Sequence, residues 1–96
     1  MSKRSLERRL TKIGIRLKGL RGELAIVEEQ LLYLGEDADD QAIRAMVAET
    51  ASSSFDARSA QGNFENMSKH RSRMIAEVAE LEQKQDELLD QMLSAK

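Results

Sequence analysis

Hydrophobic residues recur at alternating spacings of four and three over the first third of the chain. The positions that follow this spacing are Leu6, Leu10, Ile13, Leu17, Leu20, Leu24, Val27, Leu31 and Leu34. Such spacings place every one of them on a single face of an α-helix, and an unbroken apolar repeat of this length is typical of a coiled coil. We call these positions the N-terminal seam. They predict a helix over about residues 4–34.

Gly35 follows the N-terminal seam directly. Glycine often ends a helix because it adopts a left-handed backbone conformation without steric cost. Asp37 is then placed to cap a new, short helix over about residues 39–50. The apolar face of that short helix would hold Ile43, Met46 and Val47. The pattern thus predicts a short connecting helix after the first long one.

A second heptad repeat occupies the last third of the chain. Ser53 and Asp56 are spaced like a capping box, which predicts a third helix over about residues 54–94. Its repeat, which we call the C-terminal seam, consists of Phe64, Met67, Arg71, Met74, Val78, Leu81, Gln85, Leu88 and Met92. Two of these positions are polar. This segment is therefore expected to pack against the N-terminal seam as a long helix.

The two seams match in length, since residues 6–34 and 64–92 both span 28 steps. In an antiparallel arrangement the facing residue numbers sum to 98. Layers of this register include Leu6 with Met92, Ile13 with Gln85, Val27 with Arg71, and Leu34 with Phe64. A chain with 33% charged residues, no proline and three aromatic residues is also typical of long helices. We therefore predict an all-α fold in a single domain over residues 1–96, an antiparallel coiled-coil helical hairpin of two long helices with a short connecting helix.

Charge is distributed unevenly along the chain. Residues 1–22 carry eight bases and one acid, whereas residues 23–96 carry seven bases and sixteen acids. The antiparallel register lays the basic segment 3–22 beside the acidic segment 77–93, with Arg16 within reach of either Glu77 or Lys84. Exposed ion pairs contribute only ~0.2–1 kcal/mol each. We therefore expect the charges to select the orientation and the seams to supply the stability.

Four bases point away from the N-terminal seam and form a candidate partner-binding surface, the basic stripe. Its members are Arg4, Arg8, Lys12 and Lys18. Such a stripe can meet an acidic protein surface, or it can contact phosphates with a salt-dependent affinity. No aromatic residues that stack on bases accompany the stripe, and no recognition motif does. A protein partner is therefore the leading prediction, and nucleic acid is the alternative.

Another face of the first predicted helix combines glycine with isoleucine. We call Ile15, Gly19, Gly22 and Ile26 the glycine patch. A glycine inside a helix costs roughly 0.5–1 kcal/mol relative to alanine, which suggests that the backbone is closely approached there. Three interpretations stay open: the short helix folds back onto the patch, the patch mediates self-association, or the glycines have no role.

No arrangement of residues indicates catalysis or metal binding. A segment that starts at Asp37 resembles a calcium loop, but Ala42 stands where glycine is needed and Ala48 where a bidentate glutamate is needed. His70 is the single histidine and the chain has no cysteine, so the common zinc sites are excluded. The serines of 52–54 lack a nearby base in the sequence. We expect no catalytic residue, no metal and no cofactor.

The segments RSLERRLTKIGIRLKGLRGEL, EEQLLYL and AELEQKQDELL resemble those of small helical, coiled-coil proteins from actinobacteria that have no assigned activity. The resemblance covers about two thirds of the chain. It implies a bacterial cytoplasmic setting and carries no activity over to this chain.

The sequence as a whole favours a non-enzymatic protein–protein interaction module, such as an adaptor, scaffold or regulator, that forms a homo-oligomer. The alternative is a small protein that binds nucleic acid or a nucleoprotein machine through the basic stripe. The N-terminal MSKRSLERRL lacks the apolar run of a signal peptide, and no stretch reaches the roughly 20 apolar residues that span a bilayer. We therefore expect a cytoplasmic protein that does not engage a membrane.

Overall fold

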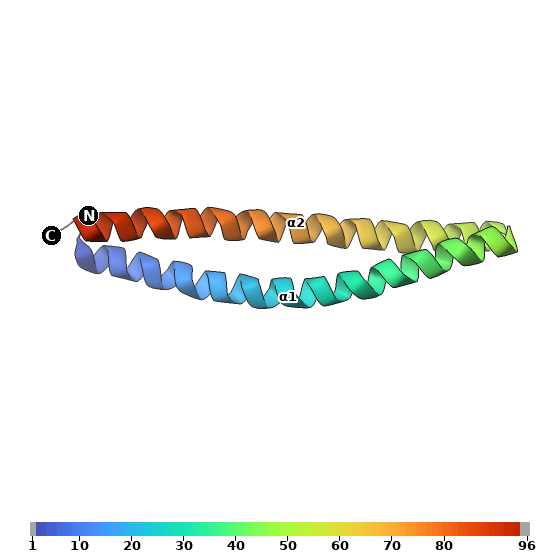
Figure 1. Ribbon diagram of the computed structural model, residues 1–96, viewed down its shortest axis with the longest axis horizontal. Helices are drawn as coiled ribbons and strands as arrows, with labels where there is room; N and C mark the ends of the chain where they lie inside the picture. The colour runs from blue at the N-terminus through green and yellow to red at the C-terminus, as the bar shows by residue number, and fades with distance from the viewer. Residues whose placement is uncertain (1, 95–96) are drawn as a thin grey trace. The chain divides into compact units, whose positions relative to one another are not determined.

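A computed structural model describes residues 2–94 and contains two long helices. Helix α1 runs over Lys3–Ala48 and helix α2 over Ala51–Ser94, with a two-residue connection between them (Figure 1). No strand occurs in residues 2–94. The predicted all-α helical hairpin is confirmed.

Burial along α1 follows the N-terminal seam. All of its positions are buried or half-buried, and Leu6, Leu17 and Leu20 retain only 1% of their accessible surface. The C-terminal seam behaves in the same way on α2, where Met74 and Leu88 are buried and the remaining positions are half-buried. The removal of this apolar surface from water is the main stabilising contribution to the pairing of the helices.

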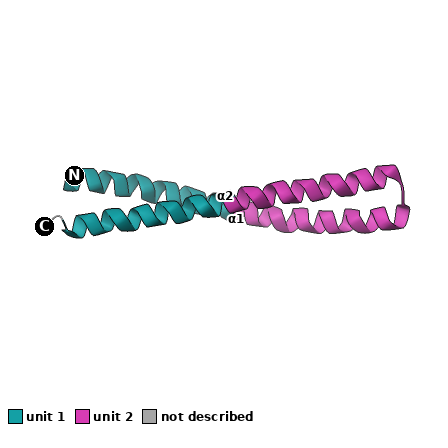
Figure 2. Ribbon diagram, turned by 90° about the horizontal axis from the view of Figure 1, so that it is seen from above, with its two compact units in different colours: residues 1–24, 73–96 teal, residues 25–72 magenta. Residues whose placement is uncertain are grey.

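Contacts within the chain form two compact units, each containing one segment of α1 and one of α2 (Figure 2). Unit 1 comprises residues 1–24 and 73–96, and unit 2 comprises residues 25–72. Both helices continue from one unit into the other. The assignment of residues 1–96 to a single domain stays a prediction.

The predicted stop at Gly35 and the separate short helix over 39–50 are wrong. Helix α1 continues through Gly35 to Ala48, and none of the described glycines has a positive φ. The heptad spacing does not end at Leu34, because it continues through a buried Ala38 and the half-buried Gln41 and Ala45. The packing of these positions against α2 outweighs the weak helix propensity of glycine.

Small residues complete the same layers on α2. Ala60 is buried, and Ala57 and Ser53 are half-buried, at the positions that the register of 98 pairs with Ala38, Gln41 and Ala45. Alanine and serine contribute little apolar surface, so these layers give a weaker hydrophobic signal than the leucine layers. The packed part of unit 2 therefore extends to the connection between the helices.

The connection is made by Glu49 and Thr50. Glu49 has a φ of 49° and its N–H donates to the carbonyl of Ala45 at 3.0 Å, an αL-type ending for α1. Thr50 caps α2, since its Oγ1 accepts from the N–H of Ser53 at 3.1 Å, while the N–H of Thr50 donates to Ser53 Oγ at 3.3 Å. The start of the last helix at about 54, with Ser53 and Asp56 as its caps, is therefore wrong: the reciprocal cap lies three residues earlier.

Two ion pairs of unit 1 agree with the predicted register. Arg16 Nη2 lies 3.0 Å from Glu77 Oε1, one of the two contacts that the sequence left open for Arg16, and Arg21 Nη2 lies 3.3 Å from Glu82 Oε2. Their residue numbers sum to 93 and 103, five on either side of 98, as expected for side chains that flank an antiparallel seam on its two sides. In unit 2, the space in front of the Gly35 Cα is bounded by Phe64 Cε2, which would lie 3.4 Å from an added Cβ.

Candidate interaction surfaces

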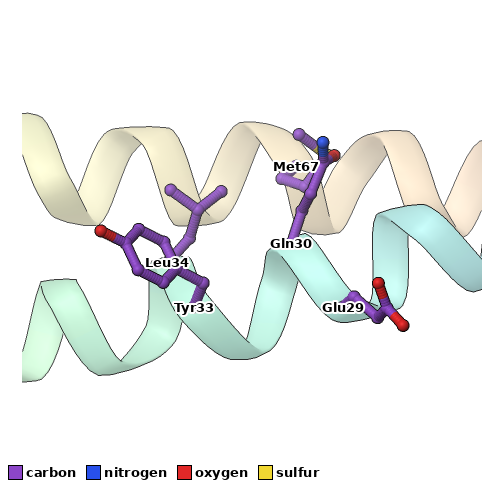
Figure 3. A pocket seen from close by; sticks show the side chains of 5 residues that line it. All are labelled: Glu29, Gln30, Tyr33, Leu34 and Met67. Carbon is purple, nitrogen blue, oxygen red and sulfur yellow. The ribbon is translucent and has the colours of Figure 1, made fainter.

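Unit 2 contains a groove in which seam side chains reach the surface. Glu29, Gln30, Tyr33, Leu34 and Met67 line a volume of about 430 Å³ (Figure 3). Tyr33 is 72% exposed although it is the largest aromatic side chain of the protein, whereas Leu34 and Met67 are half-buried. The groove thus offers an apolar floor with an aromatic rim.

A neighbouring groove shares that floor. Leu34 and Met67 also line a volume of about 390 Å³ whose other residues are Asn63, Asn66 and His70. His70 is exposed, and the other polar residues of this groove are the amides Asn63 and Asn66. Amide and imidazole groups at the edge of an apolar floor can orient a bound peptide by hydrogen bonding.

Two further grooves lie on the other flank of the same seam. They share Leu31, Leu32 and Arg71, and their volumes are about 330 Å³ and 390 Å³. Leu32 is 72% exposed, and Arg71 Nε lies 3.9 Å from Glu28 Oε1. Half-buried Phe64 lines one of the two grooves. The middle of unit 2 therefore exposes apolar side chains on both flanks of its seam.

The basic stripe is exposed along its full length. Arg4, Arg8, Lys12 and Lys18 are all exposed, and none of them takes part in an ion pair within residues 2–94. Arg16 and Arg21, by contrast, are held by Glu77 and Glu82. Within the segment 3–22, two bases thus pair inside unit 1 and four form a stripe that faces solvent.

The glycine patch is uncovered. Ile15 and Ile26 are 68% and 56% exposed, and a Cβ added at Gly19 or Gly22 would meet nothing within 4 Å. The interpretation in which a short helix folds back onto the patch is wrong, because Ile43, Met46 and Val47 belong to α1 itself and are exposed. Self-association and the absence of a role remain as interpretations.

The segments considered above for calcium binding and for nucleophilic catalysis belong to the helices and their caps. Asp37, Asp39 and Asp40 lie within α1, so they form no calcium loop. Ser53 belongs to the cap of α2. Among residues 2–94, no three histidine, aspartate or glutamate side chains gather closely enough to hold a metal ion.

Sequence reasoning missed the exposed apolar residues of unit 2. Leu32, Tyr33 and Phe55, which is 61% exposed, occupy none of the predicted seam positions. The sequence did contain a signal for this exposure. These are large apolar side chains outside the heptad seam, and a helix with one apolar face leaves such positions exposed to water. Leu32 and Tyr33 line the grooves described above and therefore belong with the candidate interaction surface.

Neither helix of the described part of the chain is long and apolar enough to cross a bilayer.

The chain matches no protein-family model, no curated protein and no solved structure. The resemblance to actinobacterial helical proteins therefore stays a prediction.

Proposed function

We propose that this protein is a non-enzymatic protein–protein interaction module, an adaptor, scaffold or regulator that presents the grooves of unit 2 to a partner helix or peptide. The observation that carries the proposal is the exposure of Leu32 and Tyr33, both 72% exposed, at the edges of grooves with apolar floors. Tyrosine and methionine are enriched at protein interfaces, and an apolar groove beside a seam suits the apolar face of a helix.

The test is affinity capture with two matched variants. The chain is immobilised and exposed to an extract of its native cell, and bound proteins are identified by mass spectrometry. Tyr33→Asp places a charge on the rim of one groove and should abolish capture of a specific protein. Leu93→Asp alters a side chain that is 70% exposed and lies far along α2 from the grooves, so it serves as the control. Equal capture by both variants would contradict the proposal.

A second candidate function is nucleic-acid binding by the basic stripe, and four exposed bases without ion pairs favour it. Its test is fluorescence anisotropy with a generic duplex at about 50 mM salt, followed by titration to higher salt. Binding that falls steeply with salt, with a slope that Arg8→Glu reduces, would place this function first. No binding at low salt leaves the interaction module in front.

We also propose that this is a cytoplasmic bacterial protein that acts as a homo-oligomer and binds a protein partner with an acidic surface.

A further inference from the structure

Helix α1 exposes one side to solvent in each unit, and the residues there differ between the units. In unit 1 these positions are Ser5, Arg8, Lys12, Ile15 and Gly19, which we call the unit 1 face. In unit 2 the positions 28 residues later are Tyr33, Glu36, Asp40, Ile43 and Val47, which we call the unit 2 face. All of them are exposed except the half-buried Ser5. Each face therefore lies within one unit and is open to a partner.

The charges of the two faces are opposite. Arg8 and Lys12 of the unit 1 face make no ion pair within residues 2–94, and neither does Glu36 of the unit 2 face. Asp40 pairs with Arg44 at 3.1 Å, and because a carboxylate accepts several hydrogen bonds, it can bind a second base as well. Each face is thus complementary to the other face, and neither is complementary to itself.

The apolar residues follow the charges at the same offset of 28 residues. Ile15 is 68% exposed, Ile43 is 56% exposed and Val47 is 81% exposed. If the two faces lie side by side in parallel, Ile15 meets Ile43 and Val47 meets Gly19. An added Cβ at Gly19 would meet nothing within 4 Å, so the space in front of this glycine is open to a side chain such as valine. Burial of these apolar groups would stabilise the contact.

We infer that the unit 2 face binds the unit 1 face of a second copy of this chain, with the two α1 helices parallel and offset by 28 residues. In this register Arg8 faces Glu36 and Lys12 faces Asp40. The inference rests on the proposed function as an oligomeric interaction module with an acidic partner. It identifies that acidic partner as unit 2 of another copy.

The residues that flank the two faces fit the same register. In a parallel pair of helices, a flanking side chain meets the partner's flank about five positions away from the residue level with it. The edge contacts on α1 are then Arg4 with Asp37, Arg9 with Leu32, Thr11 with Arg44, Arg16 with Asp39, and Glu23 with Met46. None of these contacts joins like charges. The edges therefore add no repulsion to the complementary faces.

An antiparallel pairing of the same faces fits less well. It also joins the bases of one face to the acids of the other, but it separates Ile43 from Ile15 and places Ile43 opposite Ser5. At one edge it brings Arg9 against Arg44, and like charges in opposition destabilise an interface. The parallel register is the one that matches charges and apolar residues together.

The first experiment damages the two faces separately and is read by sedimentation equilibrium at micromolar concentration. Ile15→Asp alters only the unit 1 face, and Ile43→Asp alters only the unit 2 face. Each variant alone should self-associate about tenfold more weakly or not at all, because a charge then lies in the apolar layer. An equimolar mixture should form a one-to-one complex, because each variant retains the face that the other lacks.

The matched control for this experiment is Ile26→Asp. Ile26 is 56% exposed, as Ile43 is, and it lies on α1 outside both faces. This variant should self-associate like the unchanged chain. Circular dichroism checks that all three variants remain helical.

The second experiment tests the register by disulfide formation, since the chain has no cysteine of its own. Gly19→Cys is mixed with Val47→Cys in the presence of oxidised glutathione. One thiolate displaces glutathione to form a mixed disulfide, and the thiolate of the other copy displaces the second glutathione to close the link. The control is Gly19→Cys mixed with Glu29→Cys, the position that the antiparallel pairing would place opposite Gly19. We expect the link in the first mixture only, and ¹⁵N labelling of one variant identifies it by mass.

The outcomes separate this inference from the proposed function. A monomeric unchanged chain, undiminished association of Ile43→Asp alone, no complex in the mixture, or an equal yield with Glu29→Cys would overturn the second-copy inference. The Ile43→Asp variant keeps Tyr33 and every residue that lines the grooves, so capture of a partner by this variant tests the groove proposal separately. Equal capture by Tyr33→Asp and its control, together with a one-to-one complex in the mixture, would contradict the groove proposal alone.

Discussion

Individual leucines differ widely in what they contribute to stability, although they look alike in the sequence. Leu17 has 1% of its surface exposed, and Leu93 has 70%. Truncation of a buried leucine removes apolar contacts and leaves a cavity, whereas truncation of an exposed one changes little. The burial of the seam can therefore be tested one residue at a time.

We predict that Leu17→Ala lowers the free energy of unfolding by ~2–5 kcal/mol, because the lost contacts lie in the core of unit 1. Urea denaturation followed by circular dichroism at one fixed protein concentration measures the change. Leu93→Ala is the control and should cost less than ~0.5 kcal/mol. A similar small loss for both variants would show that the N-terminal seam is not a core.

At the scale of elements, the ends of the two helices are decided by local backbone chemistry. Glu49 carries the positive φ that ends α1, and a residue with a Cβ is strained in that conformation. Thr50 and Ser53 then satisfy donors at the start of α2 with their hydroxyl groups. The connection needs only two residues, because Glu49 ends α1 and Thr50 caps α2.

We predict that Glu49→Gly raises the free energy of unfolding by ~0.5–1 kcal/mol, since glycine adopts this φ without strain. The same substitution inside α1, Glu36→Gly, should lower it by about 1 kcal/mol through the poor helix propensity of glycine. Thermal and urea unfolding of the two variants give the comparison. Changes of the same sign at both positions would refute the left-handed conformation of Glu49.

At the scale of the whole molecule, charged residues are distributed unevenly between the two units. Unit 1 has eleven bases and eight acids, and unit 2 has four bases and nine acids. Within unit 1, Arg16 and Arg21 pair across the seam with Glu77 and Glu82, and all four side chains are about half exposed. Pairs with such exposure stabilise weakly, so their main effect is on the orientation and register of the helices.

We predict that Arg16→Glu lowers the melting temperature by a few degrees, because it replaces an ion pair with a like-charge contact at Glu77. The double variant Arg16→Glu with Glu77→Arg should recover most of the loss, and about 0.5 M salt should shrink the difference. Arg4→Glu is the control and should leave the melting temperature nearly unchanged. A double variant as unstable as Arg16→Glu alone would show that the two side chains do not interact.

Only part of the candidate site could be predicted from the sequence. The basic stripe and the glycine patch were identified from helical spacing, and the structure finds both exposed. The grooves beside Tyr33 and Leu32 were not identified. A groove forms where the side chains of two packed helices leave part of the seam uncovered. Its presence therefore depends on how the two helices pack together, and the spacing of residues along either helix alone does not predict it.

The sequence by itself determined the all-α fold, both seams and the antiparallel register. The reason is that mainly apolar residues repeated at spacings of three and four specify which face of each helix is buried. The same register already placed the midpoint of the hairpin at residue 49, where the chain turns. Only the tertiary structure decided that α1 continues through Gly35. Layers built from Ala38, Ala45, Ala57 and Ala60 carry too little apolar surface to stand out in a pattern, yet when packed against each other they hold both helices together up to the turn.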